Sequence, residues 1–286
     1  MTLSPSAHAQ TDDAQELYQR GRDALAHGQS KEAVDFLEKA VALKPQDAGY
    51  HHRLGIACKA AGSEAGMLGA IPFAKKMKME LERAIDLDPN LLPARLALLE
   101  FHTMAPSMLG GSESAALEQA NEIRKRDPIE GHHAFAVLDT AAKKPELARK
   151  EYEDLVAAYP ASARAHYLFG VHLMLTEKNY KMAGSEFESA VKLDPAYMPA
   201  YFQVGHVAAL AGESLGRGEE SLKKYVAYLP KEDEPSTARA HYWLGTVYEK
   251  QGKKDEALSS YEASLKINPR QKDAEAAMKR VPPTGN

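Results

Sequence analysis

The sequence predicts an all-α fold, an α-solenoid built from about seven repeated helix pairs. Prolines recur 32 to 44 residues apart, each at the end of an amphipathic segment. A proline stops a helix because it has no N–H and restricts the residue before it. These prolines are Pro45, Pro89, Pro128, Pro160, Pro195, Pro230 and Pro269. Glycines recur in the middle of the first segment of most pairs: Gly21, Gly55, Gly170, Gly205 and Gly245. Each mid-helix glycine costs about 1 kcal/mol relative to alanine, so the pattern indicates helices that approach closely.

The clearest unit runs from Ala238 to Pro269 and reads as two amphipathic helices around the turn Gln251-Gly252-Lys253. Its marker residues are His241, Leu244, Gly245 and Tyr248 in the first helix and Ala257 and Tyr261 in the second. This spacing resembles the tetratricopeptide repeat, a helix–turn–helix with a Trp/Leu/Gly/Tyr…Ala/Phe…Pro pattern. The resemblance covers about residues 14–269 and implies a right-handed solenoid with a capping helix at its C-terminal end.

Taken in order, the chain predicts a single solenoid domain over residues 13–281, between a leader at 1–12 and a disordered tail at 282–286. The expected units are 14–45, 51–89, 91–128, 131–160, 163–195, 198–230 and 238–269. The fourth unit is expected to have a shortened first helix. In the last unit, Ser236 or Thr237 can cap the first helix, since both side chains offer an oxygen to free backbone N–H groups. Residues 271–280 form the capping helix, whose charged face suits solvent.

Two inserts depart from the repeat, at residues 62–75 and 104–112, and both contain Met-Leu-Gly. They fall at the turns of neighbouring units, so we expect them on one edge. One hypothesis packs them into an apolar lip that closes the groove of the solenoid or makes a dimer contact. The alternative is that each insert buries its own methionine and leucine. The lip residues are Met67, Leu68, Met108 and Leu109.

Composition excludes several classes of protein. The net charge of −4 provides no field suited to nucleic acid, and no apolar run approaches the roughly 18 residues of a transmembrane segment. The single Cys58 excludes an internal disulfide. Ala7-His8-Ala9 has the small-x-small form of a signal-peptidase site. We therefore expect a bacterial periplasmic or secreted protein, with a cytoplasmic one as the alternative.

The resemblance also implies a binding surface, because first helices of tetratricopeptide repeats line a peptide-binding groove. Carried over position by position, the groove residues are Tyr18, Arg22, His52, Arg164, Tyr167, Phe202, His206, Arg239 and Tyr242. Their spacing lies off the Leu/Gly packing stripe, which predicts exposure. The C-terminal half thus offers aromatic residues flanked by arginines, a surface for a peptide with apolar anchors and an acidic group.

No catalytic or cofactor motif is found, so we expect neither an enzyme nor a bound cofactor or metal. His51, His166 and His241 all occupy the Trp-like repeat position, where a packed histidine is expected. Cys58 occupies a core position and is expected to be a buried, inert thiol.

The favoured function is a non-enzymatic scaffold or adaptor that binds a protein or peptide in the groove. The alternative is a small-ligand-binding accessory protein of a transport system, with the groove closed by the inserts. An open groove would favour the first, and a sealed groove the second.

Overall fold

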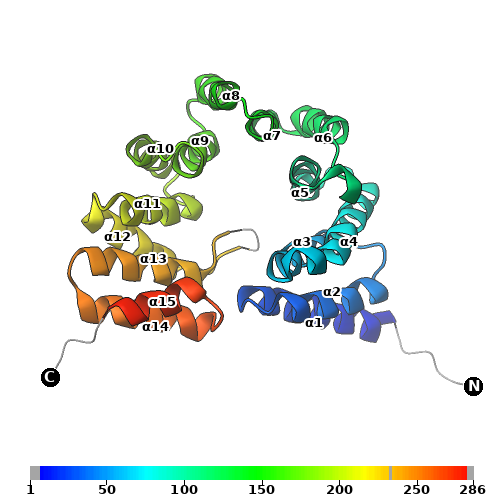
Figure 1. The fold of residues 1–286 in the computed structure, drawn as a ribbon, viewed down its shortest axis with the longest axis horizontal. Helices are drawn as coiled ribbons and strands as arrows, with labels where there is room; N and C mark the ends of the chain where they lie inside the picture. Colours follow the sequence, from blue (N-terminus) through cyan, green and yellow to red (C-terminus); the bar gives the residue numbers. More distant parts are fainter. Residues whose placement is uncertain (1–6, 232–233, 282–286) are drawn as a thin grey trace, which may run out of the picture. The chain divides into compact units, whose positions relative to one another are not determined.

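The computed structural model describes residues 7–231 and 234–281, which form fifteen α-helices and one short 3-10 helix (Figure 1). The chain divides into two compact units, residues 1–148 and 149–286. Within the described ranges no strand is present. The predicted all-α solenoid of seven helix pairs and a C-terminal capping helix is confirmed.

Unit 1 contains the first three helix pairs and the first helix of the fourth. Its helices are α1 (Ala7–Ala26), α2 (Ser30–Leu43), α3 (Ala48–Glu64), α4 (Gly66–Leu87), α5 (Leu92–Met104), η1 (Ser107–Leu109), α6 (Glu113–Arg126) and α7 (Pro128–Ala141). The boundary between the units lies within α8 (Pro145–Ala158).

Unit 2 contains the remaining pairs and the capping helix. Its helices are α9 (Ala163–Leu175), α10 (Tyr180–Leu193), α11 (Met198–Ala211), α12 (Leu215–Val226), α13 (Thr237–Lys250), α14 (Lys254–Ile267) and α15 (Lys272–Arg280). Ser236 caps α13 by accepting a hydrogen bond from the backbone N–H of Arg239 at 3.3 Å, as the sequence predicted.

Two boundaries differ from the sequence prediction. The first helix of the fourth pair, α7, is not shortened, because Pro128 begins it and Asp127 caps it instead of the helix starting later. Pro suits the first helical position, where its missing N–H would have no partner. Helix α1 begins at Ala7, within the predicted leader. Residues 1–6 and the predicted tail at 282–286 lie outside the described residues.

The mid-helix glycines do mark close helix approach. A Cβ built at Gly205 would lie 2.1 Å from Leu222 Cγ, and one at Gly245 would lie 2.6 Å from Tyr261 Cε1. The neighbour is therefore the large side chain on the second helix. In the third pair the sizes are exchanged: buried Leu99 of α5 shares a core cluster with Ala120 of α6.

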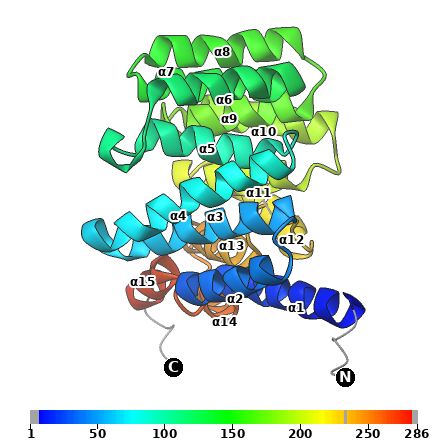
Figure 2. The ribbon, with the colours of Figure 1, turned by 90° about the vertical axis from the view of Figure 1, so that its right-hand side faces the viewer.

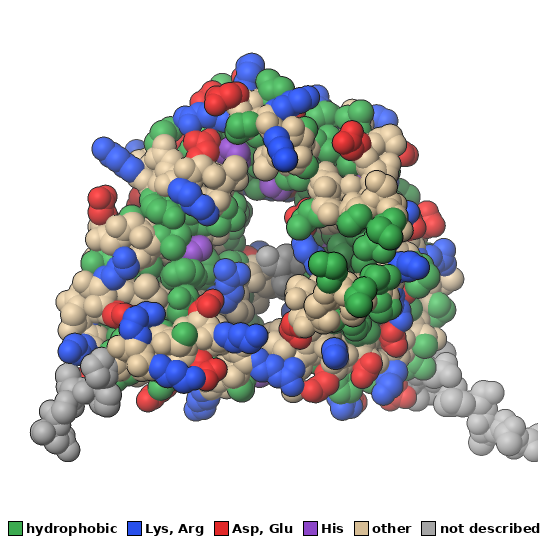
Figure 3. Space-filling view, viewed as in Figure 1, with side chains coloured by type: hydrophobic (Ala, Val, Ile, Leu, Met, Phe, Trp, Pro, Cys, Tyr) green, Lys and Arg blue, Asp and Glu red, His purple; other side chains and the backbone are tan. Residues whose placement is uncertain are grey.

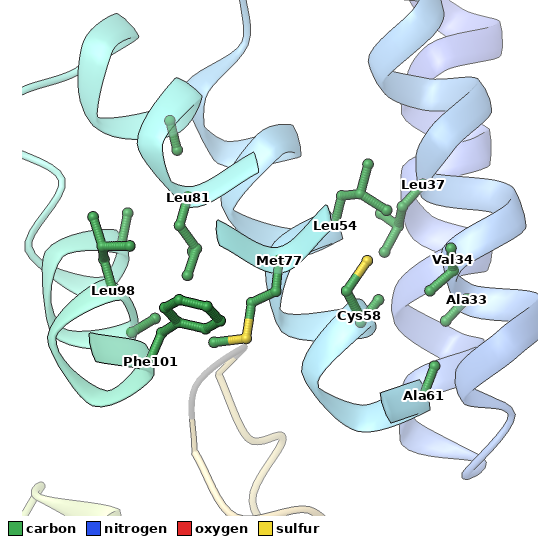
Figure 4. Packing of buried hydrophobic residues seen from close by; sticks show 14 of the residues in the cluster. Ala33, Val34, Leu37, Leu54, Cys58, Ala61, Met77, Leu81, Leu98 and Phe101 are labelled. Carbon is green, nitrogen blue, oxygen red and sulfur yellow. The ribbon is translucent and has the colours of Figure 1, made fainter. Parts of the chain in front are cut away.

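The core of unit 1 lies between successive helix pairs. Leu37 of α2, Leu54 and Cys58 of α3, Leu81 of α4 and Phe101 of α5 belong to one buried cluster, and Figure 4 shows these side chains converging from the four helices. Burial raises the pKa of the Cys58 thiol to about 12. The thiol is buried and protonated, as predicted.

A second recurrent contact explains two of the three histidines at the Trp-like position. The Nε2 atoms of His51 and His166 lie 3.2 and 3.1 Å from the carbonyl oxygens of Pro45 and Pro160. Tyr201 donates to the carbonyl of Pro195 in the same way. Each side chain thus binds the proline carbonyl six residues earlier and holds the turn against the next first helix. These histidines are structural.

The first insert is helical, since it lengthens α3 and α4 and leaves only Ala65 between them. The second forms η1 and the turn after it. Both protrude on the same side of unit 1 (Figure 2), and hydrophobic side chains gather over this region at the right of Figure 3. Met67 is 89% exposed and Met108 is 88% exposed. Within this chain both expectations for the inserts are wrong, because Met67, Leu68 and Met108 neither pack into a lip nor are buried by their own inserts. A dimer contact through them stays a prediction.

Candidate functional site

Three first helices of unit 2, α9, α11 and α13, lie next to one another in chain order (Figure 1). We call the surface that they share the first-helix face. Serine caps fix the start of the two outer helices, through Ser162 at α9 and Ser236 at α13. Six of the predicted groove residues lie on these helices: Arg164, Tyr167, Phe202, His206, Arg239 and Tyr242.

The middle of this face is buried, which corrects the prediction for two residues. Phe202 is 1% exposed and packs edge-on against Tyr225 of α12, with ring centroids 5.3 Å apart. His206 is 7% exposed because Trp243 of α13 stacks on it at 4.1 Å. Neighbouring first helices pack so closely that these side chains are covered from the side. They form the floor of the face rather than its contact surface.

The accessible part of the face surrounds this floor. Tyr167 and Tyr242 are half-buried, and Arg239 is exposed. The Tyr242 ring lies 4.7 Å from Trp243. Gln203 links the floor to the edge: it accepts from His206 Nδ1 at 3.1 Å and its amide nitrogen lies 3.5 Å from the Tyr167 hydroxyl. The face therefore presents two tyrosine edges and the exposed guanidinium of Arg239 over a fixed hydrogen-bonded floor, with Arg164 half-buried.

The charge of the face centres on Arg239. The side chain of Arg239 makes no hydrogen bond or ion pair to any described residue. Burial, together with the smaller effect of the Arg239 charge, lowers the pKa of His206 to about 4. Burial also raises the pKa of Tyr167. Both groups are therefore neutral near pH 7, so the exposed cation of this face is Arg239, and Arg164 is half-buried.

The predicted groove residues of unit 1 do not form a comparable surface. Tyr18 is half-buried and stacks on Tyr50 with ring centroids 4.5 Å apart. Arg22 donates to Gln19 of its own helix at 3.2 Å. His52 is buried, so its predicted exposure is also wrong. These positions thus serve packing in unit 1, and in unit 2 they serve packing at Phe202 and His206 and an accessible edge at Tyr167, Arg239 and Tyr242.

Sequence reasoning missed Trp243 and Gln203, which follow the groove positions Tyr242 and Phe202 directly. Their position faces the neighbouring first helix rather than the groove, and a search limited to groove positions skips it. Trp243 is the one tryptophan of the chain, and that rarity was the available signal.

Other kinds of site are not found in the described ranges. No group of three or more His, Cys, Asp or Glu side chains there is arranged to hold a metal. No helix among these residues combines the length and apolar character of a membrane span.

The sequence signature of the tetratricopeptide repeat matches residues 238–271, and a second tetratricopeptide signature matches residues 133–197. No curated protein matches the chain.

Solved structures similar to this chain share its fold at low identity. A chain of the APC/C hetero-tetramer Cut9–Hcn1 is 14% identical, with a TM-score of 0.51 over 91% of this chain and 48% of that one. The IFIT1 monomeric mutant with Gppp-AAAA is 16% identical, with a TM-score of 0.53 over 96% of this chain and 62% of that one. A tetratricopeptide repeat protein from Parabacteroides merdae is 15% identical, with a TM-score of 0.49 over 94% and 99%.

The chain thus spans about half the length of the Cut9–Hcn1 chain, and at these identities the likeness shows the fold alone. The two signatures cover α13 and α14 and most of α7 to α10, and the other described helices follow the same pairwise order. The glycine and proline positions fulfil the roles that the repeat assigns to them. The chain is a tetratricopeptide repeat protein.

Proposed function

We propose that this protein is a non-enzymatic scaffold that binds an extended peptide segment of a partner protein on the first-helix face of unit 2. Tetratricopeptide repeats in general are protein-interaction modules, which supports the scaffold role. The observation that carries the proposal is the pairing of exposed Arg239 with the half-buried rings of Tyr167 and Tyr242. Aromatic rings supply contact area at low entropic cost, and a guanidinium binds a carboxylate through two parallel hydrogen bonds.

The preferred segment follows from this chemistry. It carries apolar side chains that lie against the two tyrosine edges and an Asp, Glu or terminal carboxylate that reaches Arg239. The floor of Phe202, His206 and Trp243 is packed in advance, so binding does not need to order it. A rigid floor lowers the entropic cost of binding.

We place this activity in the bacterial envelope. The Ala7-His8-Ala9 sequence supports this location by its similarity to a signal-peptidase site. The alternative of a groove sealed by the inserts has less support, because Met67 and Met108 stay exposed instead of packing over a ligand.

Selection of displayed random peptides tests the proposal without knowledge of the partner. The wild-type protein should enrich peptides that combine apolar and acidic residues. Arg239→Glu should replace the acidic preference by a basic one. Lys266→Glu makes a charge change on α14, away from the face, and should leave the selected sequences unchanged. Identical peptides from wild type and Arg239→Glu would contradict the proposal.

A further inference from the structure

A cleft of about 550 Å³ lies in unit 1 between α4, α5 and α6. It is separate from the first-helix face, and the proposed function does not use it. Leu98 and Ile85 give it an apolar base, and its remaining walls are polar. Gly110 and Ser112 of the second insert line one end. The insert that departs from the repeat is therefore part of the wall.

Two matching gaps between second helices are bridged by an ion pair. Between α2 and α4, Glu38 pairs with Lys76. Between α10 and α12, Arg217 donates to both carboxylate oxygens of Glu188, at 2.8 and 3.1 Å. In each pair the carboxylate directly follows the large core residue of its helix, and the cation is one helix pair further on.

The cleft lacks this bridge. Glu82 directly follows core residue Leu81 and thus corresponds to Glu188, but the position that corresponds to Arg217 holds Ala115. The ion-pair partner of Glu82 is Lys78 on its own helix, at 3.6 Å. Unlike Glu38 and Glu188, Glu82 therefore has no ion pair across its gap, and it lines the cleft.

A buried histidine points to a ligand independently of these carboxylates. His102 is 7% exposed and lines the cleft. Its Nδ1 donates to the carbonyl oxygen of Gly110 at 3.1 Å, which leaves Nε2 of the neutral ring as an acceptor. Nε2 has no hydrogen-bond partner among the described residues. Burial lowers the pKa of His102, which keeps the ring neutral.

The backbone of the second insert holds this arrangement in place. Gly110 has a φ of 98°, in the left-handed region that favours glycine. A Cβ at Gly111 would lie 1.8 Å from the carbonyl oxygen of Ala105. The turn therefore requires both glycines, and it is this turn that brings the Gly110 carbonyl to His102.

The groups that remain available in the cleft are acceptors. Four carboxylates line it, those of Glu82, Asp86, Glu118 and Glu122, against two cations, Lys78 and Arg95. Arg95 is already bonded to the Pro89 carbonyl and to Gln119, at 2.8 and 2.9 Å. Glu122 is bonded to Lys125 and Arg126 at 2.6 Å each. Asp86, Glu118 and His102 Nε2 are left without an ion pair or hydrogen bond among the described residues.

We propose that this cleft binds a small organic cation that has N–H donors at both ends, such as a diamine or a guanidino-amine. Glu82 and Asp86 of α4 hold one end, Glu118 of α6 holds the other, and Nε2 of His102 accepts a hydrogen bond. A neutral ligand would leave the facing carboxylates unneutralised, and an anionic ligand would be repelled.

Isothermal titration of the whole protein with agmatine tests this site. We expect one site per chain and no heat of binding with butane-1,4-diol, a neutral molecule with polar groups at both ends. Ala115→Arg supplies the missing bridge to Glu82 and should weaken agmatine binding at least tenfold. Glu118→Gln, a change of an exposed residue, should weaken it as well. Arg217→Ala, in the bridged gap of unit 2, should leave the affinity unchanged.

The outcomes separate the interpretations. Absence of binding to the wild-type protein, or equal affinity in wild type and Ala115→Arg with both proteins folded by circular dichroism, would overturn the proposal. Acetyl-arginine amide carries a single cation and stands for a partner's side chain. Tighter binding of agmatine assigns the site to a free diamine, and tighter binding of the amide assigns it to an arginine of a partner protein. Failure here leaves the peptide selection on the first-helix face unaffected, because that experiment tests other residues.

Discussion

The third and sixth helix pairs make the same internal contact in opposite ways. In the sixth pair, Gly205 of α11 leaves room that Leu222 of α12 fills. In the third pair, Leu99 of α5 is the large residue and Ala120 of α6 is the small one. The contact requires one small and one large residue, and either helix can supply each. A search for glycine alone therefore undercounts the repeats.

The two pairs also differ in how they meet the preceding pair. Arg217 of α12 bridges its gap by pairing with Glu188, whereas Ala115 of α6 cannot pair with Glu82, which lines the cleft. The first gap holds an ion pair beside a cleft of about 410 Å³, and the second holds a cleft of about 550 Å³ without a cross-gap ion pair. Variants that exchange these features test both halves of the comparison.

The largest expected effect comes from Phe202→Ala. Phe202 is fully buried between α11 and α12, so its removal should cost about 4 kcal/mol of unfolding free energy. Leu96 occupies the corresponding position of the third pair and is only half-buried, so Leu96→Ala should cost about 1 kcal/mol. Urea unfolding measures both. Equal losses would contradict this account, because they would mean that Phe202 and Leu96 are equally buried.

Gly205→Leu should cost about 3 kcal/mol, because the new side chain meets Leu222 at overlapping distance. Adding Leu222→Ala imitates the third pair and should restore more than half of the loss. Gly216→Ala is the matched control, since nothing lies within 4 Å of a Cβ there. Thermal unfolding of the four proteins decides the matter: a double variant no more stable than Gly205→Leu would refute the exchange.

Acid should lower the unfolding free energy through a buried histidine in each of the two helix pairs. The folded-state pKa of His206 is about 4, below the ordinary value near 6.5, so the unfolded chain binds more protons between these values. The contribution of neutral His206 to the unfolding free energy is therefore complete above pH 6.5 and is lost as the pH falls toward 4. At pH 5 the loss from this residue is about 2 kcal/mol. Burial also lowers the pKa of His102 in the third pair.

Unfolding of His206→Phe at pH 7 and pH 5 tests this contribution. The variant should lose less stability than wild type over that interval. A wild-type protein equally stable at both pH values would show that His206 protonates freely in the folded state.

The smallest effect is expected at the gaps. Arg217 and Glu188 are partly exposed, so Arg217→Ala should cost about 1 kcal/mol or less. Ala115→Arg should gain at most a similar amount by pairing with Glu82. When both substitutions are made in one protein, their changes in unfolding free energy should add, because the two sites belong to different units. A strong stabilisation by Ala115→Arg would indicate that repulsion in the cleft is greater than we infer.

The repeat number, the packed histidines and the capping Ser236 could all be predicted from sequence, because each depends on local spacing. The burial of Phe202 and His206 could not, since it depends on how closely Trp243 of the next repeat approaches. The position of a residue within its own repeat does not reveal how closely the next repeat approaches it. The cleft could not be predicted from one sequence either. The absence of a cation at Ala115 is noticed only when the structure shows that Arg217 and Lys76 form ion pairs at the equivalent positions.

Photocrosslinking in cells from position 242 tests the central claim most directly. A benzoylphenylalanine that replaces Tyr242 keeps an aromatic ring on the first-helix face, and the same residue at exposed Glu262 of α14 is the control. The account predicts a discrete crosslink at 242 that is absent at 262, through an apolar and acidic segment of one protein, and that is lost when Arg239→Glu is added. Equal crosslinks from both positions, or a crosslink at 242 that Arg239→Glu does not change, would contradict it.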